Sequence, residues 1–302
     1  MAEEGLQLFG GDWTERKLDA LARYLVAYST ALSKTRFQKV YIDAFAGTGY
    51  REQKLAANPA TPSIFDDEVK EIASSEPQQF LDGSAKLALK IDPPFQRFVF
   101  IEREQAKVAE LENLKKEFVS KADSIDIHAG DANETIQRLC QSWNRWEDRG
   151  VLFLDPFGMQ ADWSTVRAVA ETGCIDTWIL FPLAANRLMT RNPADIPDGW
   201  RLRLDKLFGS GAWEERFYRP RTITDIFSGD FQVVEKALTL QGLGAFYKEQ
   251  LQKVFPVVAP NPCTLRSSGN HPLFQLFFAA GAQPDRGGNI AVRMAKHILD
   301  KI

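Results

Sequence analysis

Cysteine is scarce in this sequence, and long apolar runs are missing from it. The three cysteines, Cys140, Cys174 and Cys263, are odd in number and far apart. They form no Cys-x-x-Cys pair, so the sequence predicts neither a zinc site nor a disulfide framework. No apolar stretch approaches the roughly 20 residues of a membrane-spanning helix, and residues 1–4 lack the basic start of a secretory signal. We therefore expect a cytoplasmic protein that makes no membrane contact.

Histidine and net charge are also low. His128 and His271 have no companion at metal-ligand spacing, so the sequence predicts no metal site. The formal net charge of −3 provides no general attraction to nucleic acid, and any such contact has to be local. With 302 residues, 44% of them hydrophobic and 25% charged, the chain can bury a large core as one enlarged domain or two small ones.

Three apolar runs with the pattern of buried strands each end in an acidic residue. The runs and their acids are 38–44 with Asp43, 98–102 with Glu102, and 151–155 with Asp155. Open α/β sheets bind ligands at the carboxyl ends of their strands. After the first run, Gly47 and Gly49 allow a sharp turn and a close approach of the backbone to a ligand. The sequence therefore predicts a cofactor site at this edge.

A missing third glycine bears on the identity of that cofactor. A dinucleotide seats its pyrophosphate on a helix N-terminus through a G-x-G-x-x-G sequence. Here Tyr50-Arg51-Glu52 follows the second glycine, and Pro59 and Pro62 prevent a long uninterrupted helix. S-adenosylmethionine has no phosphate. It needs a place for its amino-acid end, acceptors for the ribose hydroxyls and a partner for the adenine amine.

The acids along the predicted edge match these needs in chain order. Asp43 with the glycine turn suits the amino-acid end, Glu102 suits the ribose hydroxyls, and Asp131 suits the adenine. An ordinary turn or a helix N-cap explains any one of these residues alone, whereas the ordered series favours S-adenosylmethionine. The residues predicted to bind the cofactor are Asp43, Phe45, Gly47, Gly49, Glu102, Asp131 and Ala132.

Strand and helix patterns alternate along most of the chain, which predicts a parallel sheet with crossover helices. The predicted strands are 38–44, 98–102, 125–129, 151–155 and 175–181, and the predicted helices are 83–90, 105–119, 133–143, 164–171 and 290–299. Residues 254–266 and 272–280 read as an antiparallel hairpin. We predict an α/β, Rossmann-like class I methyltransferase sheet in a single domain covering 1–302.

A first helix is predicted at 13–32, opened by a capping box of Asp12 and Glu15. Trp13 and Lys17 on this helix could line a cofactor site, but core packing or a solvated surface is the preferred interpretation of both. The sequence also predicts two insertions. Residues 53–81 are polar and interrupted by prolines, as in a lid, and residues 184–241 form a helical insertion rich in arginine and aromatic residues.

The second insertion carries the candidate substrate-binding residues Arg187, Arg191 and Arg201. Arginine interspersed with aromatic side chains suits phosphates and unstacked bases. The alternative is an amphipathic helical insertion whose arginines pair with its own acids. The sequence favours neither interpretation clearly, although an insertion after the fifth strand emerges at the same sheet edge as the acids.

The predicted catalytic residues are Asp155, Pro156 and Phe157, in the sequence Asp-Pro-Phe-Gly. An exocyclic amine can donate hydrogen bonds to the Asp155 side chain and the Pro156 carbonyl, which turns its lone pair toward a methyl donor, while Phe157 stacks on the base. Such positioning supplies much of the rate of a group transfer, and a base in a duplex must also be flipped out. The motif is similar to that of tRNA guanine dimethyltransferases, so guanine and RNA remain open as targets.

Taken together, these segments resemble the three-Cys-motif partner proteins. The resemblance is carried by Leu8-Phe9-Gly10-Gly11-Asp12-Trp13, Tyr41-Ile42-Asp43-Ala44-Phe45-Ala46-Gly47-Thr48-Gly49, Gly83-Ser84-Ala85, Phe100-Ile101-Glu102, Leu154-Asp155-Pro156-Phe157-Gly158-Met159 and Phe181-Pro182. It implies a bacterial class I methyltransferase-like domain encoded beside a three-cysteine protein, which is then a possible partner.

The sequence thus predicts an S-adenosylmethionine-dependent methyltransferase that modifies an exocyclic amino nitrogen of a nucleic-acid base, in DNA or RNA. One alternative is a non-catalytic module that keeps the nucleotide fold for assembly with another protein. A second alternative is an NAD-linked oxidoreductase.

Overall fold

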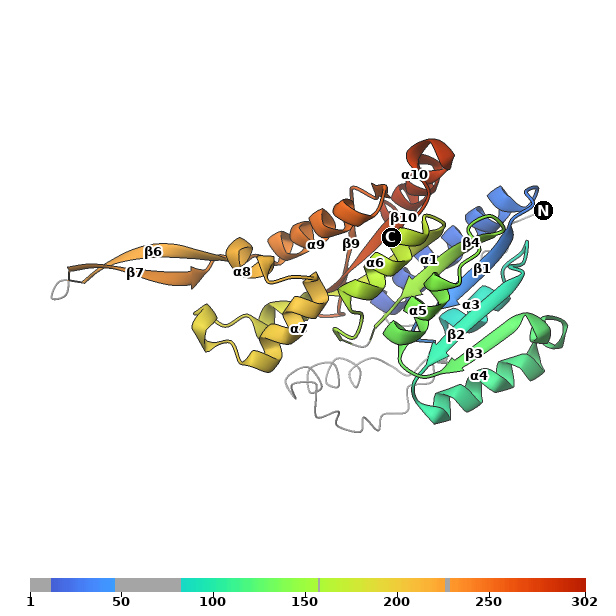
Figure 1. The fold of residues 1–302 in the computed structure, drawn as a ribbon, viewed down its shortest axis with the longest axis horizontal. Helices are drawn as coiled ribbons and strands as arrows, with labels where there is room; N and C mark the ends of the chain where they lie inside the picture. Colours follow the sequence, from blue (N-terminus) through green and yellow to red (C-terminus); the bar gives the residue numbers. More distant parts are fainter. Residues whose placement is uncertain (1–11, 47–82, 157, 226–228) are drawn as a thin grey trace.

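The computed structural model describes residues 12–46, 83–156, 158–225 and 229–302 of the chain (Figure 1). Its centre is a mostly parallel sheet in the order β3-β2-β1-β4-β5-β10-β8, with β9 paired to β10. The strands are β1 (Gln38–Asp43), β2 (Arg97–Glu102), β3 (Ile125–Ala129), β4 (Asp148–Leu154), β5 (Ile175–Pro182), β8 (Val257–Val258), β9 (Cys263–Arg266) and β10 (Pro272–Ala280). The predicted class I methyltransferase sheet is confirmed by this strand order.

Strand polarity agrees with the prediction as well. The five strands β1 to β5 pair in parallel with one another, whereas β10 pairs antiparallel with β5, β8 and β9. The predicted C-terminal hairpin is present as β9 and β10, but the predicted first arm over 254–266 is divided into the end of α9 (Leu240–Val254) and the separate strands β8 and β9. The chain builds outward from β1 through β2 to β3 and then returns to the other side of β1 with β4. The switch between β1 and β4 is where open α/β sheets bind their ligands.

Both faces of the sheet are buried under helices, which explains why the central strands are almost wholly apolar. Alternate residues of β1 point to opposite faces, so Val40 and Ile42 lie in one core cluster and Tyr41 lies in the other. The first cluster includes residues of α5 (Ala132–Gln141), α6 (Trp163–Thr172) and α9 (Leu240–Val254). The second includes residues of α1 (Asp12–Leu32), α3 (Ser84–Leu89), α4 (Gln105–Glu117) and α10 (Gly288–Leu299).

The segment between β5 and α9 contains short helices followed by a hairpin. Its elements are η2 (Leu183–Leu188), η3 (Pro193–Asp195), α7 (Asp198–Phe208), α8 (Ala212–Phe217), β6 (Tyr218–Asp225) and β7 (Gly229–Lys236). β6 and β7 pair only with each other, and Figure 1 shows this two-stranded sheet reaching away from the central sheet. The prediction of a helical insertion over 184–241 is thus right for α7 and α8 and wrong for the hairpin.

The hairpin escaped prediction although its first residue, Tyr218, is buried in the first core cluster. Polar residues occupy both of its faces, so it lacks the two-residue alternation of a half-buried strand. Helix α9 was also not predicted, although Leu243, Phe246 and Tyr247 bury one side of it. The predicted insertion at 53–81 lies outside the described residues. No described helix is both long enough and apolar enough to cross a bilayer.

Candidate active site at the carboxyl ends of the sheet

Asp43 ends β1 and is completely buried. The Tyr41 hydroxyl donates a hydrogen bond to its Oδ2 at 3.1 Å, and the Phe45 N–H donates to its Oδ1 at 3.4 Å. Burial raises the pKa of Asp43 from its ordinary value of 3.8 to about 6, opposed by a hydrogen bond from Ser84 and reinforced by the nearby charge of Asp155. A cationic partner would stabilise the ionised form of this buried carboxyl.

Asp155 directly follows β4, the strand that pairs with β1. Its Oδ2 lies 2.5 Å from the Nζ of Lys17, and the side chains of Lys17 and Asp155 are only 10% and 21% exposed. The same ammonium lies 4.9 Å from the ring centroid of Trp13, and that ring stacks on Phe274 at 5.1 Å. Helix α1 therefore supplies the counter-charge of the predicted catalytic acid.

This contact corrects the preferred interpretation of α1. Core packing is confirmed for Trp13, which is 5% exposed. It is wrong as the main role of Lys17, because that side chain forms an ion pair with a predicted site residue across the sheet edge. The sequence contains no signal for this pair beyond a lysine near the start of a helix that covers the cofactor edge.

Backbone N–H groups hold the carboxylates of Glu102 and Asp131 in place through hydrogen bonds. Glu102 ends β2, and its Oε1 accepts the N–H groups of Arg103 and Glu104 at 2.7 and 2.8 Å. Asp131 is the N-cap of α5, and its Oδ1 accepts the N–H groups of Asn133 and Glu134 at 2.9 and 3.1 Å. In the part of the chain that the structure describes, no protein donor bonds the second oxygen of either carboxylate. Each acid is therefore oriented while one of its oxygens stays available.

The four acids share one edge of the sheet because they end, or closely follow, adjacent parallel strands. The Gly130 N–H donates to the Glu102 carbonyl at 3.0 Å, which ties the ends of β2 and β3 together. Ala132 and Pro156 are buried beside this edge, and Phe45 is half-buried against the core. The predicted residues Gly47, Gly49 and Phe157 lie outside the described residues.

The predicted substrate-binding arginines have different surroundings. Arg201 on α7 pairs with Glu214 and donates to the Pro193 carbonyl at 2.9 Å, so it ties parts of the insertion together. Arg191 is 84% exposed and lies 2.6 Å from Glu235 on β7. Arg187 on η2 is exposed. Because each pairs with an acid of the same insertion, the ion pairs favour the structural interpretation for both Arg201 and Arg191, although the side chain of Arg191 is 84% exposed.

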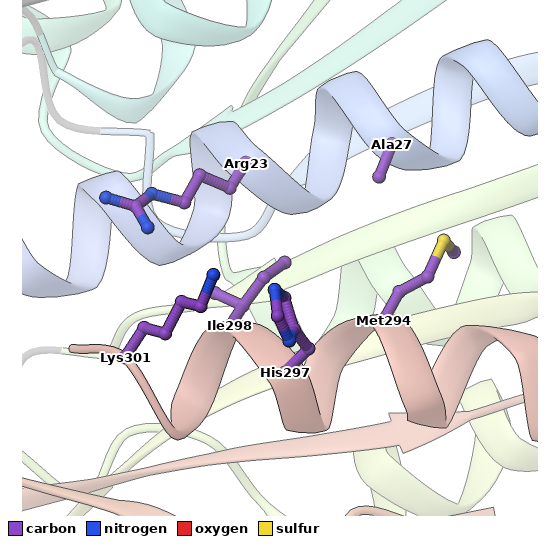
Figure 2. A pocket seen from close by; sticks show the side chains of 6 residues that line it. All are labelled: Arg23, Ala27, Met294, His297, Ile298 and Lys301. Carbon is purple, nitrogen blue, oxygen red and sulfur yellow. The ribbon is translucent and has the colours of Figure 1, made fainter.

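A hollow of about 280 Å³ lies elsewhere, between α1 and α10 (Figure 2). Its lining residues are Arg23, Ala27, Met294, His297, Ile298 and Lys301. None of the residues predicted to form the site lines this hollow. Among the described residues, no cluster of three or more His, Cys, Asp or Glu side chains could hold a metal ion.

The sequence matches no family model and no curated protein. Several solved structures are similar to this chain at low identity. Protein LPL1258 from Legionella pneumophila is 16% identical, with 81% of this chain and 93% of that one covered and a TM-score of 0.37. Spermidine synthase from Thermotoga maritima is 11% identical, covering 90% and 60%, with a TM-score of 0.38. TYW2 from M. jannaschii, solved in complex with AdoMet, is 14% identical, covering 70% and 76%, with a TM-score of 0.24. Because these similarities are low, the methyltransferase fold is assigned here from the strand order.

Proposed function

We propose that this protein is an S-adenosylmethionine-dependent methyltransferase that transfers a methyl group to an exocyclic amino nitrogen of a nucleic-acid base. The observation that carries the proposal is the meeting of Asp43 and Asp155 at the switch point between β1 and β4, with Glu102 and Asp131 along the same edge. One fully buried carboxyl lies within electrostatic reach of a second carboxylate there, and this arrangement suits a cationic ligand beside an amine.

The proposed cofactor fits the second carboxylate oxygens of Glu102 and Asp131, which no protein donor among the described residues occupies. Bound S-adenosylmethionine supplies a sulfonium-activated methyl group. Asp43 attracts its positively charged amino-acid end, the second oxygen of Glu102 accepts from the ribose hydroxyls, and that of Asp131 accepts from the adenine amine. The backbone hydrogen bonds already made to Glu102 and Asp131 hold these carboxylates in place. Such preorganisation reduces the entropy lost when a ligand binds.

The acceptor end is argued from Asp155 and Pro156. Lys17 occupies Oδ2 of Asp155, so Oδ1 is the oxygen that accepts a hydrogen bond from the target amine. A second hydrogen bond to the Pro156 carbonyl orients the lone pair of that nitrogen toward the methyl group. The carbon–sulfur bond breaks as the carbon–nitrogen bond forms, and the nitrogen then releases one proton to water. Positioning of the two reactants supplies most of the rate in such a mechanism.

The nucleic-acid acceptor is supported by the Asp-Pro motif and by Arg191, whose side chain is 84% exposed although it pairs with Glu235. By resemblance, a three-cysteine protein encoded nearby is the proposed partner. The hairpin of β6 and β7 belongs to the same insertion as Arg191 and extends away from the central sheet (Figure 1).

The test is methyl transfer from radiolabelled S-adenosylmethionine to total cellular DNA and RNA. We expect the wild type to label one of the two, and Asp155→Ala to abolish labelling while calorimetry still detects cofactor binding. Asp176→Asn is the matched control, because Asp176 is also buried but lies near the amino end of β5.

Two other results would decide for the alternatives. Cofactor binding without transfer to any nucleic acid, with or without the three-cysteine protein, favours the non-catalytic module. Heat released on titration with NAD and none with S-adenosylmethionine favours the oxidoreductase.

A further inference from the structure

The side chain of Asn133 makes three hydrogen bonds that join α5 to the segment after β4. Its Oδ1 accepts the Asp162 N–H at 2.9 Å and the Thr165 hydroxyl at 2.8 Å. Its Nδ2 donates to the Gln160 carbonyl at 2.8 Å. A half-buried amide with three well-placed bonds holds its partners in one geometry, because an unsatisfied buried group would be costly.

The segment that Asn133 holds is the loop that carries the predicted catalytic residues. Its described residues are 155–156 and 158–162, and Asp162 is the N-cap of α6, which begins at Trp163. Met159 is 3% exposed and anchors the middle of the loop in the core. Gly158 has a φ of +67°, a conformation that glycine adopts without strain. The loop is therefore fixed at its middle by Met159 and at its far end by Asn133.

Asn133 also touches the predicted cofactor site. Its backbone N–H donates to Asp131 Oδ1 at 2.9 Å, while its side chain bonds the far end of the catalytic loop. One residue thus connects the acid that faces the adenine to the loop that faces the target amine. The next residue along the chain, Glu134, bonds the same oxygen of Asp131.

From this arrangement we propose that Asn133 is a positioning residue, which sets the place of the Asp155 loop relative to the cofactor. The inference rests on the proposed function. Asn133 touches neither reacting atom; it acts through Gln160 and Asp162. Loss of its side chain leaves the cofactor acids intact but lets the loop move, and misplacement of a reacting group by about 1 Å can reduce a rate about a hundredfold.

Gln137 provides a matched control on the same helix, one turn further along. Its Nε2 donates to the hydroxyl oxygens of Ser164 and Thr165 at 3.3 and 3.2 Å, so it also bridges α5 and α6. These bonds reach only side chains of α6, whereas Asn133 bonds the backbone of the loop. Gln137→Ala therefore reports the effect of weakening the contact between the two helices.

The experiment compares Asn133→Ala, Asn133→Asp and Gln137→Ala in three measurements. For Asn133→Ala we expect kcat to fall about ten- to a hundredfold, while the dissociation constant for S-adenosylmethionine changes by less than about threefold. The Asp162 amide should exchange with deuterium about tenfold faster, because its acceptor is gone. Asn133→Asp keeps both acceptor bonds but replaces the donor with a carboxylate oxygen that repels the Gln160 carbonyl, so its kcat should also fall below that of the wild type.

Three outcomes overturn the inference: equal kcat for Asn133→Ala and Gln137→Ala, unchanged exchange of the Asp162 amide in Asn133→Ala, and a loss of cofactor affinity as large as the loss of kcat. If the wild type transfers no methyl group to any nucleic acid, the proposed function fails. In that case deuterium exchange of the Asp162 amide alone decides the role of Asn133. Slowing of the Asp162 amide by S-adenosylmethionine in the wild type but not in Asn133→Ala supports it, and equal behaviour of the two proteins overturns it.

Discussion

The ammonium of Lys17 lies 2.5 Å from Oδ2 of Asp155, although the two residues are 138 positions apart in the chain. This ion pair joins the first helix to the carboxyl edge of the sheet. It places a positive charge beside Asp155, which in turn lies within electrostatic reach of Asp43. The charge balance of the candidate site therefore depends on α1.

Replacement of Lys17 by methionine should destabilise the protein and reduce methyl transfer. The substitution keeps much of the aliphatic stem but leaves Asp155 largely buried without its ion pair. We expect a loss of about 1–3 kcal/mol in the free energy of unfolding, less than for a fully buried pair because Asp155 is 21% exposed. Urea denaturation measures the loss. Arg23→Met is the control, since Arg23 forms an exposed pair with Asp19 on the same helix and should cost less than about 1 kcal/mol. Equal stability of the two variants would contradict the prediction.

Cofactor affinity should rise with pH through the pKa of Asp43. That pKa is about 6, and only the ionised carboxylate attracts a cationic ligand. Because roughly a tenth of Asp43 is ionised at pH 5 and most of it at pH 7, S-adenosylmethionine should bind about tenfold more tightly at pH 7. Calorimetry at both pH values measures the ratio. The ratio should fall to about one in Asp43→Asn and persist in Asp176→Asn; a wild-type affinity that does not change with pH would count against the role of Asp43.

Asp176→Asn should stabilise the protein above pH 6. The Asp176 carboxyl accepts the Tyr24 hydroxyl at 2.7 Å and the Gly281 N–H at 3.0 Å, yet burial raises its pKa from 3.8 to about 6. The folded state therefore binds more protons than the unfolded state between these values, and this group's contribution to stability falls as the pH rises through that window.

The expected gain is about 1–3 kcal/mol at pH 8 and much less at pH 5, where the carboxyl is mostly protonated when folded. Chemical denaturation of wild type and variant at the two pH values checks this difference. A gain of the same size at both would show that the ionisation of Asp176 is not its source.

Arg191→Ala and Arg201→Ala should separate nucleic-acid binding from structure. Arg191 is exposed, so its loss should weaken binding of a single-stranded oligonucleotide and lower the slope of log affinity against log salt by about one. Its effect on the free energy of unfolding should stay below about 0.5 kcal/mol. Arg201→Ala should instead cost about 1–2 kcal/mol, because it removes the bonds to Glu214 and Pro193. Fluorescence anisotropy at several salt concentrations and urea denaturation measure the two effects. If Arg191→Ala binds like the wild type, the insertion does not hold the nucleic acid through that side chain.

Strands in the centre of the sheet could be predicted because they are buried on both faces and therefore read as apolar runs. β5, which is buried along its whole length, spans Ile175–Pro182, and the prediction was 175–181. β4 begins at Asp148, three residues before the predicted start at residue 151, because its first residues are polar and carry no burial signal. The hairpin of β6 and β7 had no such signal, since polar residues interrupt both of its strands.

The sequence by itself determined the order of β1 to β5 and the acids that end or closely follow β1 to β4, because parallel strands carry their carboxyl ends to one edge whatever surrounds them. Only the tertiary structure decided the pairing of Lys17 with Asp155, the three bonds of Asn133 and the complete burial of Asp43. These contacts join residues far apart in the chain or depend on how helices cover the sheet. Their geometry is set by packing, which no local pattern of residues records.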